Sequence, residues 1–244
     1  KSRSLGAVLT GSPLYFDLGD YTSPESPDIL MAGCGTGQHP LQTACRFSNA
    51  SVLAVDLSLS SLSYALRKTN EVGFSNIEYA QADITELGGL GRQFDLIECS
   101  GVLHHLGDPL AGWQILVDLL RPGGLMQIGL YSEIARQDIL RGRSLIAEKG
   151  YSTSPEDIRR CRQDFIAMAE DGNPTMAKIC NGRDFYSLSE CRDLLFHVQE
   201  HRFTLPQIEE ALKDLNLKFL GFEMRDQRVL KQFKESPPNS NAIN

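Results

Sequence analysis

The chain has 244 residues, of which 41% are hydrophobic and 23% are charged, and its formal net charge is -7. This composition supports a buried core and excludes a disordered or collagen-like chain. The negative net charge disfavours a protein that binds nucleic acid over a broad basic surface. No apolar run reaches the roughly 18 residues that a membrane helix requires, and the N-terminal apolar stretch is too short and too broken for a signal peptide.

The six cysteines are spread along the chain, and none of them forms a C-x-x-C pair. A disulfide scaffold or a zinc ribbon would space its cysteines differently. We therefore expect reduced thiols and a cytoplasmic setting.

The first half of the chain alternates short apolar runs with helical patterns. Apolar runs stopped by glycine are typical of buried strands, and the spacing between them is typical of amphipathic helices. The predicted strands are 28–32, 51–56, 76–81, 94–100 and 125–131, and the predicted helices are 38–47, 59–72 and 109–120. Residues 121–124 (RPGG) are expected to form a tight turn. This repetition predicts an α/β fold with a parallel sheet and helices on both faces.

The second half is mostly helical in pattern and rich in arginine from residue 132 to 180. Two more helices are predicted at 187–200 and 205–215, and the alternation in 217–224 (LKFLGFEM) predicts a strand. The polar segment 236–244 is expected to be a disordered tail.

The segment 31–38 (MAGCGTGQ) follows a predicted strand and opens a predicted helix. Glycines there let the backbone turn sharply and approach a ligand, and the helix N-terminus offers free N–H groups. The dinucleotide fingerprint is G-x-G-x-x-G, whereas Gln38 stands where its third glycine would lie. This spacing disfavours a nicotinamide-dependent oxidoreductase but leaves it open.

Two carboxylates follow the next strands. Asp56 ends the second strand, about 20 residues beyond the loop, where a carboxylate can accept both hydroxyls of a ribose. Its alternative role is to cap the next helix. Asp83 follows the third strand and could accept from an adenine amino group, with Ile84 against the ring. A simple turn aspartate explains Asp83 equally well.

The motifs ILMAGCGTG (29–37), VLAVDLS (52–58), YAQADI (79–84), FDLIECSGVLHHL (94–106) and LLRPGGLMQIGLY (119–131) together resemble a class I S-adenosylmethionine (SAM)-dependent methyltransferase. More narrowly, GLYSEIAR (129–136) and residues 183–208 resemble bacterial methyltransferase domains attached to tetratricopeptide-repeat segments. Any such segment would lie upstream of Lys1, so the chain would be a fragment of a longer protein.

The resemblance implies a Rossmann-like, mostly parallel sheet of seven strands, or of six, with a helical insertion after the fifth strand. It divides the chain into a SAM-binding core (1–132 and 203–235), an insertion that caps the substrate (133–202) and the tail (236–244). The family sheet closes with a hairpin of two late strands, and only the first of them, 217–224, is evident here.

The resemblance also implies the site residues. The loop would pass under the methionine part of SAM, Asp56 would hold the ribose, and Leu57, Asp83 and Ile84 would contact the adenine. Ser100 would offer its backbone to the amino group of SAM, and Val102 and His105 would border the sulfur. Many family members carry an acid two positions before the first glycine, where this chain has Met31. The predicted cofactor-binding residues are thus Gly33, Cys34, Gly35, Gly37, Gln38, Asp56, Leu57, Asp83, Ile84, Ser100, Val102 and His105.

Two further motifs have ordinary explanations. His197–His201 matches H-x-x-E-H, which some zinc peptidases place on a helix, but a catalytic zinc needs a third ligand as well. We predict no metal and assign the motif to a polar helix face or a pocket wall. The arginines between 136 and 162 are a solvated helix face, or else an anion-binding rim.

The leading hypothesis is a methyltransferase that moves the methyl group of SAM to a small-molecule, peptide or protein acceptor and leaves S-adenosylhomocysteine (AdoHcy). Such an enzyme must align the nucleophile with the S–CH3 bond and exclude water. If a base is used, His104 and Tyr131 are the candidates. The alternatives are an NAD(P)-dependent oxidoreductase and a non-catalytic SAM-binding regulatory domain.

Overall fold

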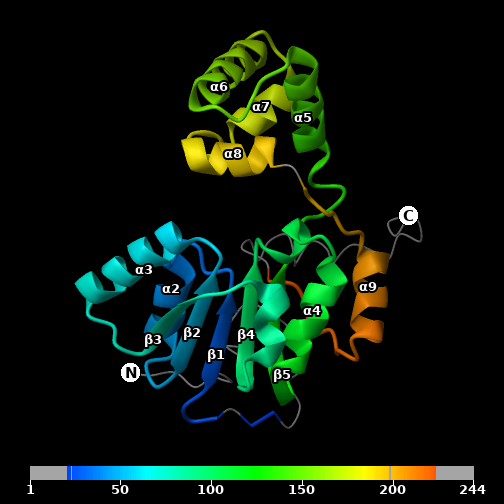
Figure 1. The fold of residues 1–244 in the computed structure, drawn as a ribbon. Helices are drawn as coiled ribbons and strands as arrows, with labels where there is room; N and C mark the ends of the chain where they lie inside the picture. Colours follow the sequence, from blue (N-terminus) through cyan, green and yellow to red (C-terminus); the bar gives the residue numbers. More distant parts are fainter. Residues whose placement is uncertain (1–20, 23, 198, 224–244) are drawn as a thin grey trace, which may run out of the picture. The chain divides into compact units, whose positions relative to one another are not determined.

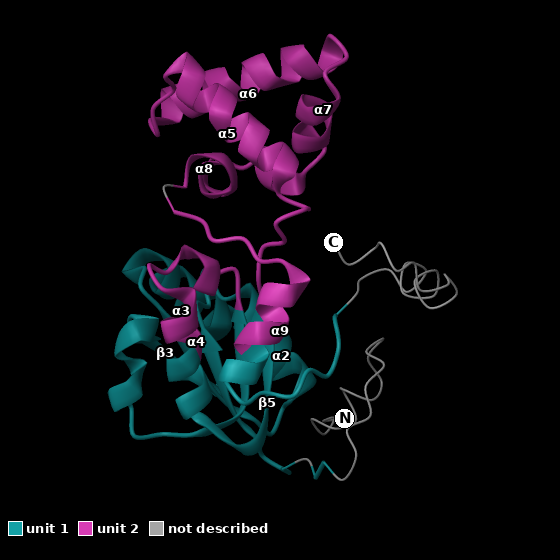
Figure 2. Cartoon of the chain, turned by 90° about the vertical axis from the view of Figure 1, so that its right-hand side faces the viewer, with its two compact units in different colours: residues 1–99, 114–128, 212–244 teal, residues 100–113, 129–211 magenta. Residues whose placement is uncertain are grey.

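The structure is a computed structural model that describes residues 21–22, 24–197 and 199–223 (Figure 1). Contacts divide the chain into two compact units, coloured separately in Figure 2. The first unit comprises 1–99, 114–128 and 212–244, and the second comprises 100–113 and 129–211. The predicted domain limits at 132 and 203 stay predictions, and the predicted tail lies outside the described residues.

The first unit is built on a five-stranded sheet in the order β3-β2-β1-β4-β5 (Figure 1). β1 pairs in parallel with β2 and with β4, and β2 pairs in parallel with β3. The strand order reverses beside β1, and open α/β sheets bind their ligands at the carboxyl ends of the strands next to such a reversal. The strands are β1 (Asp28–Ala32), β2 (Ser51–Asp56), β3 (Ile77–Gln81), β4 (Phe94–Ser100) and β5 (Leu120–Gly129).

Two helices pack against β2 and β3, namely α2 (Gln38–Arg46) and α3 (Leu59–Val72). The local sequence sets the ends of α3. The Ser58 hydroxyl accepts a hydrogen bond from the Ser61 N–H at its start, and Gly73 adopts a left-handed conformation (φ 85°) at its end. The interior strands β1 and β2 are almost fully buried, as continuous apolar runs predict for parallel strands.

The predicted sheet of seven strands, or six, is wrong for the described residues, which contain five strands. Residues 217–223 are not a strand, and Met224 lies outside the described range. Alternating apolar residues form a strand only when their backbone pairs with a neighbouring strand, and residues 217–223 pair with none of the described strands. Here Phe219 and Phe222 are half-exposed and contact each other edge to face, with ring centroids 4.9 Å apart.

The turn predicted at 121–124 is also wrong, because β5 begins at Leu120 and runs through these residues. Gly123 takes a positive φ of 76° inside the strand. A glycine in that conformation lets a strand bend locally without ending.

The second unit holds four helices around its own apolar core (Figure 1). Its largest fully buried side chains include Phe165, Phe185 and Ile158. None of the helices in the described part of the chain is long and apolar enough to cross a membrane. The four helices are α5 (Gln137–Lys149), α6 (Pro155–Glu170), α7 (Pro174–Cys180) and α8 (Leu188–Phe196), while α4 (Pro109–Asp118) and α9 (Leu205–Asp214) run across the limits of the two units.

Candidate functional site

The glycine loop between β1 and α2 turns through three left-handed residues, Gly33 (φ 81°), Gly35 (φ 54°) and Gly37 (φ 86°). A Cβ at Gly37 would lie 2.6 Å from the Cβ of Ala65 in α3, so only glycine fits there. A Cβ at Gly35 would meet nothing within 4 Å. The loop is therefore packed against the protein at Gly37 and open at Gly35, as a cradle for a ligand must be.

Asp56 holds this loop from the end of β2. Its Oδ2 accepts a hydrogen bond from the Gly35 N–H at 2.7 Å, and its Oδ1 accepts one from the Ser58 N–H at 2.8 Å. The alternative that Asp56 caps α3 is wrong, because Ser58 is the capping residue. Each carboxylate oxygen has two acceptor positions, so Asp56 keeps capacity for ligand hydroxyls.

Asp83 caps a short 3-10 helix (Ile84–Gly89), and its Oδ1 accepts hydrogen bonds from both the N–H and the hydroxyl of Thr85. Its turn role is thus confirmed, and its adenine contact stays a prediction. Ile84 is buried, whereas Leu57 is 61% exposed beside Asp56. An exposed leucine next to this carboxylate is compatible with the predicted adenine contact.

Glu98 is a polar residue of this region that sequence reasoning missed. It lies in β4 directly opposite Met31 of β1, and the Thr43 hydroxyl donates to its carboxylate at 3.1 Å. Burial raises the pKa of Glu98 above its ordinary value, although the Thr43 hydrogen bond opposes the shift. The signal in the sequence was a carboxylate between two apolar residues, Ile97 and Cys99, of a strand.

In the second unit, the side chains of His104 and Tyr131 stack, with ring centroids 3.7 Å apart. His104 is 1% exposed, and neither of its ring nitrogens has a hydrogen-bond partner among the described residues. Burial, with a smaller contribution from His105, lowers the pKa of His104 to about 4. Burial raises the pKa of Tyr131, so its phenolate is scarce at neutral pH.

The family model for a methyltransferase domain matches residues 29–124, which include the glycine loop, Asp56 and Glu98. This chain carries a class I SAM-dependent methyltransferase domain. SAM is accordingly the cofactor of the domain, and AdoHcy is its demethylated product.

Two relatives illustrate the match. An uncharacterized protein from Synechococcus sp. is 31% identical over 219 residues, which cover 82% of this chain and 49% of that protein. Trans-aconitate 2-methyltransferase from Deinococcus radiodurans is 36% identical over 107 residues, covering 43% of this chain and 39% of that protein. The chain thus spans about half the length, or less, of the curated relatives it matches.

The fold is shared with a solved structure, that of PKMT2 from Rickettsia typhi in complex with AdoHcy. The TM-score is 0.67 at 20% sequence identity, over 94% of this chain and 47% of that chain. The methyltransferase fold of this chain is therefore also found in a much longer protein.

The predicted site residues of the methyltransferase fall into two groups. The first unit brings together the loop residues, Asp56 and Leu57. The second unit contains Ser100, Val102, His104, His105 and Tyr131. Val102 precedes the short 3-10 helix η2 (Leu103–His105). Ser100 packs closely on Gly129, because a Cβ added at Gly129 would lie 2.3 Å from the Ser100 hydroxyl oxygen.

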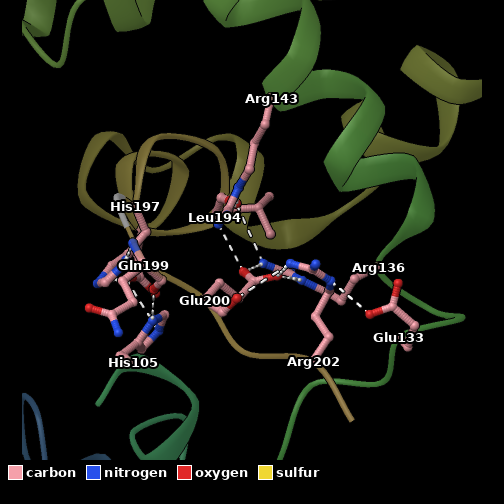
Figure 3. A network of polar contacts seen from close by, with 10 residues as sticks. His105, Glu133, Arg136, Arg143, Leu194, His197, Gln199, Glu200 and Arg202 are labelled. Atoms are coloured by element: carbon pink, nitrogen blue, oxygen red, sulfur yellow. Dashed lines mark hydrogen bonds and ion pairs between the residues drawn. The ribbon is translucent and has the colours of Figure 1, made fainter. Parts of the chain in front are cut away.

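Most of the arginines between 136 and 162, for which a solvated face or an anion-binding rim was predicted, fall into two sets. Arg141, Arg159 and Arg160 are exposed and pair with acids of their own helices, as a solvated face does. Arg136 and Arg143 instead contact the carboxylate of Glu200, whose side chain is 1% exposed (Figure 3). These two guanidiniums neutralise a buried charge, which is a structural role.

The H-x-x-E-H motif does not lie on one helix, because α8 ends at Phe196 and His197 is extended (φ -65°, ψ 132°). The predicted helix 187–200 is therefore too long. Glu200 of the motif binds arginines, and the His201 N–H donates to the His104 carbonyl at 2.7 Å. The zinc-peptidase geometry, with both histidines on one helix face, is absent from these described residues.

Proposed function

We propose that this chain transfers the methyl group of SAM to an acceptor nucleophile by in-line displacement. The observation that carries the proposal is the glycine cradle whose open residue, Gly35, is held by Asp56 at the carboxyl end of β2. This is the edge at which open α/β sheets bind nucleotides. When bound, SAM supplies an electrophilic methyl group, so the protein itself has to bind, orient and exclude water.

The residues of the first unit fit this cofactor. The loop from Gly33 to Gly37, with Cys34 and Gln38, would receive the methionine part, and Asp56 would accept the ribose hydroxyls. Burial and the neighbouring Asp56 raise the pKa of the Cys34 thiol to about 12, so Cys34 is neutral and packs as a small apolar residue.

Glu98 replaces, in this proposal, the acid that the family carries at position 31. Side chains opposite each other on neighbouring parallel strands project from the same face of the sheet. Glu98 therefore lies beside the position from which that acid would act, and its carboxylate is suited to hold the amino group of SAM. A carboxylate that is partly removed from water costs stability, which favours a functional reason for its presence.

Glu98→Gln is expected to raise the melting temperature at pH 7 and to lower SAM affinity about 10-fold. The raised pKa of Glu98 means that its contribution to stability is present at low pH and lost as pH rises through the folded-state pKa. The neutral amide removes this loss, so the two proteins should converge in stability below the ordinary carboxyl pKa. Calorimetric scans from pH 3.5 to 8, with SAM titrations at pH 7.5, measure both effects.

A variant that is stabilised but binds SAM normally would remove Glu98 from the cofactor role. A variant that is destabilised at pH 7 would contradict the electrostatic argument as well. Thr43→Val is the matched control, because it removes the hydroxyl that donates to Glu98 while leaving the carboxylate in place.

His104 is the residue that we propose as the acceptor of the nucleophile's proton. Its ring is neutral at neutral pH and therefore keeps a lone pair that can accept a proton. The high pKa of Tyr131 favours an orienting role for this tyrosine over a basic one.

The ring of His104 is expected to titrate near pH 4 and to remain neutral at pH 7. Its pKa is depressed by burial, so the stability that the neutral ring provides is lost as pH falls from 6.5 toward 4. Nitrogen-detected NMR of the five histidines, with His104→Gln to assign the resonance, measures this pKa. A value near 6.5 would mean that the ring is solvated and would contradict the burial of His104.

The test of the function itself is a calorimetric titration of the folded chain with AdoHcy and with NADH. We expect heat with AdoHcy and none with NADH, and the reverse would favour the oxidoreductase. Labelled SAM incubated with candidate acceptors separates an enzyme, which releases AdoHcy, from a regulatory domain, which leaves SAM intact. The acceptor class (small molecule, peptide or protein), an attached repeat segment and a cytoplasmic setting with reduced thiols belong to this proposal.

A further inference from the structure

Three potential metal ligands converge in the second unit, and only one of them, His197, belongs to the H-x-x-E-H motif. They are His105 in η2, Asp193 in α8 and His197 just after α8. Figure 3 shows the two histidines. One ligand atom from each residue lies within 4.8 Å of the other two. The Asp193 Oδ1 is nearly equidistant from the His105 Nε2 (3.9 Å) and the His197 Nε2 (4.0 Å).

The His105 ring is oriented as a metal-ligating imidazole is. Its Nδ1 lies 2.9 Å from the Gln199 carbonyl oxygen and donates to it, which leaves the lone pair on Nε2. That Nε2 is buried, faces Asp193 and has no hydrogen-bond partner among the described residues. A buried acceptor of this kind needs a donor, which a proton shared with Asp193, a water molecule or a cation can supply.

The other two ligands come from one short segment. Asp193 and His197 are four residues apart, so they project from the same side of the end of α8. The His197 ring stacks on the His105 ring with centroids 3.8 Å apart. The Gln199 N–H donates to the His197 Nδ1 at 3.2 Å, which is a long hydrogen bond. This bond has to break when the His197 Nε2 binds a cation, because the ring proton then lies on Nδ1.

The position of the Gln199 carbonyl is itself well supported. The next residue, Glu200, is anchored by Arg136 and Arg143, and the Gln199 side chain donates to the Leu106 carbonyl at 3.1 Å. Arg136 and Arg143 share the Glu200 carboxylate, so their charge is partly neutralised near the cluster. Burial lowers the pKa of His105 and the neighbouring His197 also disfavours a positive charge there, whereas the carboxylates of Asp193 and Glu200 favour one.

We propose that His105, Asp193 and His197 form a binding site for a divalent transition metal of the zinc type. Two imidazoles and one carboxylate are a donor set that zinc accepts, with a fourth position left for water or another ligand. At metal–ligand distances of about 2.1 Å, tetrahedral ligand atoms lie roughly 3.4 Å apart. The Asp193 Oδ1 lies 3.9 Å and 4.0 Å from the two Nε2 atoms, so each of these two distances has to shorten by about half an ångström. The metal would tie η2, which follows β4, to the end of α8. This replaces the sequence prediction of no metal.

The experiment uses the full chain, stripped with a chelator and titrated with ZnCl2 by calorimetry and with CoCl2 by visible absorption. We expect one equivalent to bind and the cobalt spectrum to be that of a low-symmetry site with nitrogen and oxygen ligands. Asp193→Asn and His197→Gln should each weaken zinc binding 10-fold or more. Because Asp193 and His197 are partly exposed, these variants are expected to fold, which circular dichroism checks.

His201→Gln is the matched control, since it removes the second histidine of the H-x-x-E-H motif but none of the three ligands. We expect its zinc affinity to stay within 2-fold of the unmodified chain. Loss of binding in His201→Gln with retention in Asp193→Asn would assign the metal to the sequence motif and overturn the proposal. Cys45→Ser is a second control, because Cys45 is an exposed thiol and could bind zinc by itself.

Absence of any specific zinc or cobalt binding would also overturn the proposal and leave a shared proton at His105. SAM binding by the domain is measured separately, so a failure of the metal site leaves the proposed methyl transfer untouched.

Discussion

Asp56→Ala is expected to lower the affinity for SAM and for AdoHcy about 100-fold while the domain stays folded. Two hydrogen bonds from ribose hydroxyls to a carboxylate account for roughly 3 kcal/mol, which corresponds to about two orders of magnitude in Kd. The loss of the Gly35 anchor adds to this effect, because the loop is then held by fewer contacts to β2. Calorimetric titration with AdoHcy measures the change.

Glu78→Ala is the control for Asp56. Glu78 is an acid of the neighbouring strand β3 that is exposed and pairs with Arg92 at 3.1 Å. An exposed ion pair contributes little to stability, so this variant should bind AdoHcy normally. If Asp56→Ala retained full affinity in a folded protein, the ribose role of Asp56 would be excluded, and with it the proposed position of the cofactor.

Gly37→Ala and Gly35→Ala are expected to separate the stability of the loop from its ligand binding. Alanine at Gly37 would have to adopt a left-handed conformation and would clash with Ala65 at 2.6 Å. Together these effects lower the free energy of unfolding by about 3 kcal/mol. Alanine at Gly35 meets open space, so its cost is about 1 kcal/mol. The added methyl group at Gly35 would nevertheless occupy the cradle, so AdoHcy affinity should fall sharply.

Urea unfolding gives the two stabilities, and calorimetry gives the affinities. Gly91→Ala is the matched control, since Gly91 has the same left-handed conformation (φ 64°) and open space but lies away from the loop. It should lose as much stability as Gly35→Ala and no affinity. Equal AdoHcy binding by Gly35→Ala and Gly91→Ala would show that the loop does not receive the ligand.

Much of the first unit could be predicted because local signals there agree with one another. The limits of β1, β2, α3 and β4 match the predicted ones, since apolar runs, a serine cap and a glycine C-cap all lie within a few residues. The glycine loop and Asp56 could also be predicted from the sequence, because each occupies a fixed place relative to the end of a strand.

The errors arose where a local pattern needed a distant partner. Residues 217–223 alternate as a strand does but have no ladder, and the predicted helix 187–200 ends at Phe196. In the second case, Glu200 lies beyond the end of the helix, and its carboxylate contacts Arg136 and Arg143. The sequence shows neither the lack of strand pairing nor the buried ion pair.

The amino-acid sequence by itself determined the alternation of strands and helices, the loop with its three left-handed glycines and the order of the family motifs. These depend on backbone conformation and on apolar periodicity, which act over a few residues. Only the tertiary structure decided that Glu98 stands beside Met31, that His104 is buried without a partner and that His105 faces Asp193 and His197. Such pairings depend on strand order, desolvation and packing between segments tens of residues apart, and no local pattern encodes them.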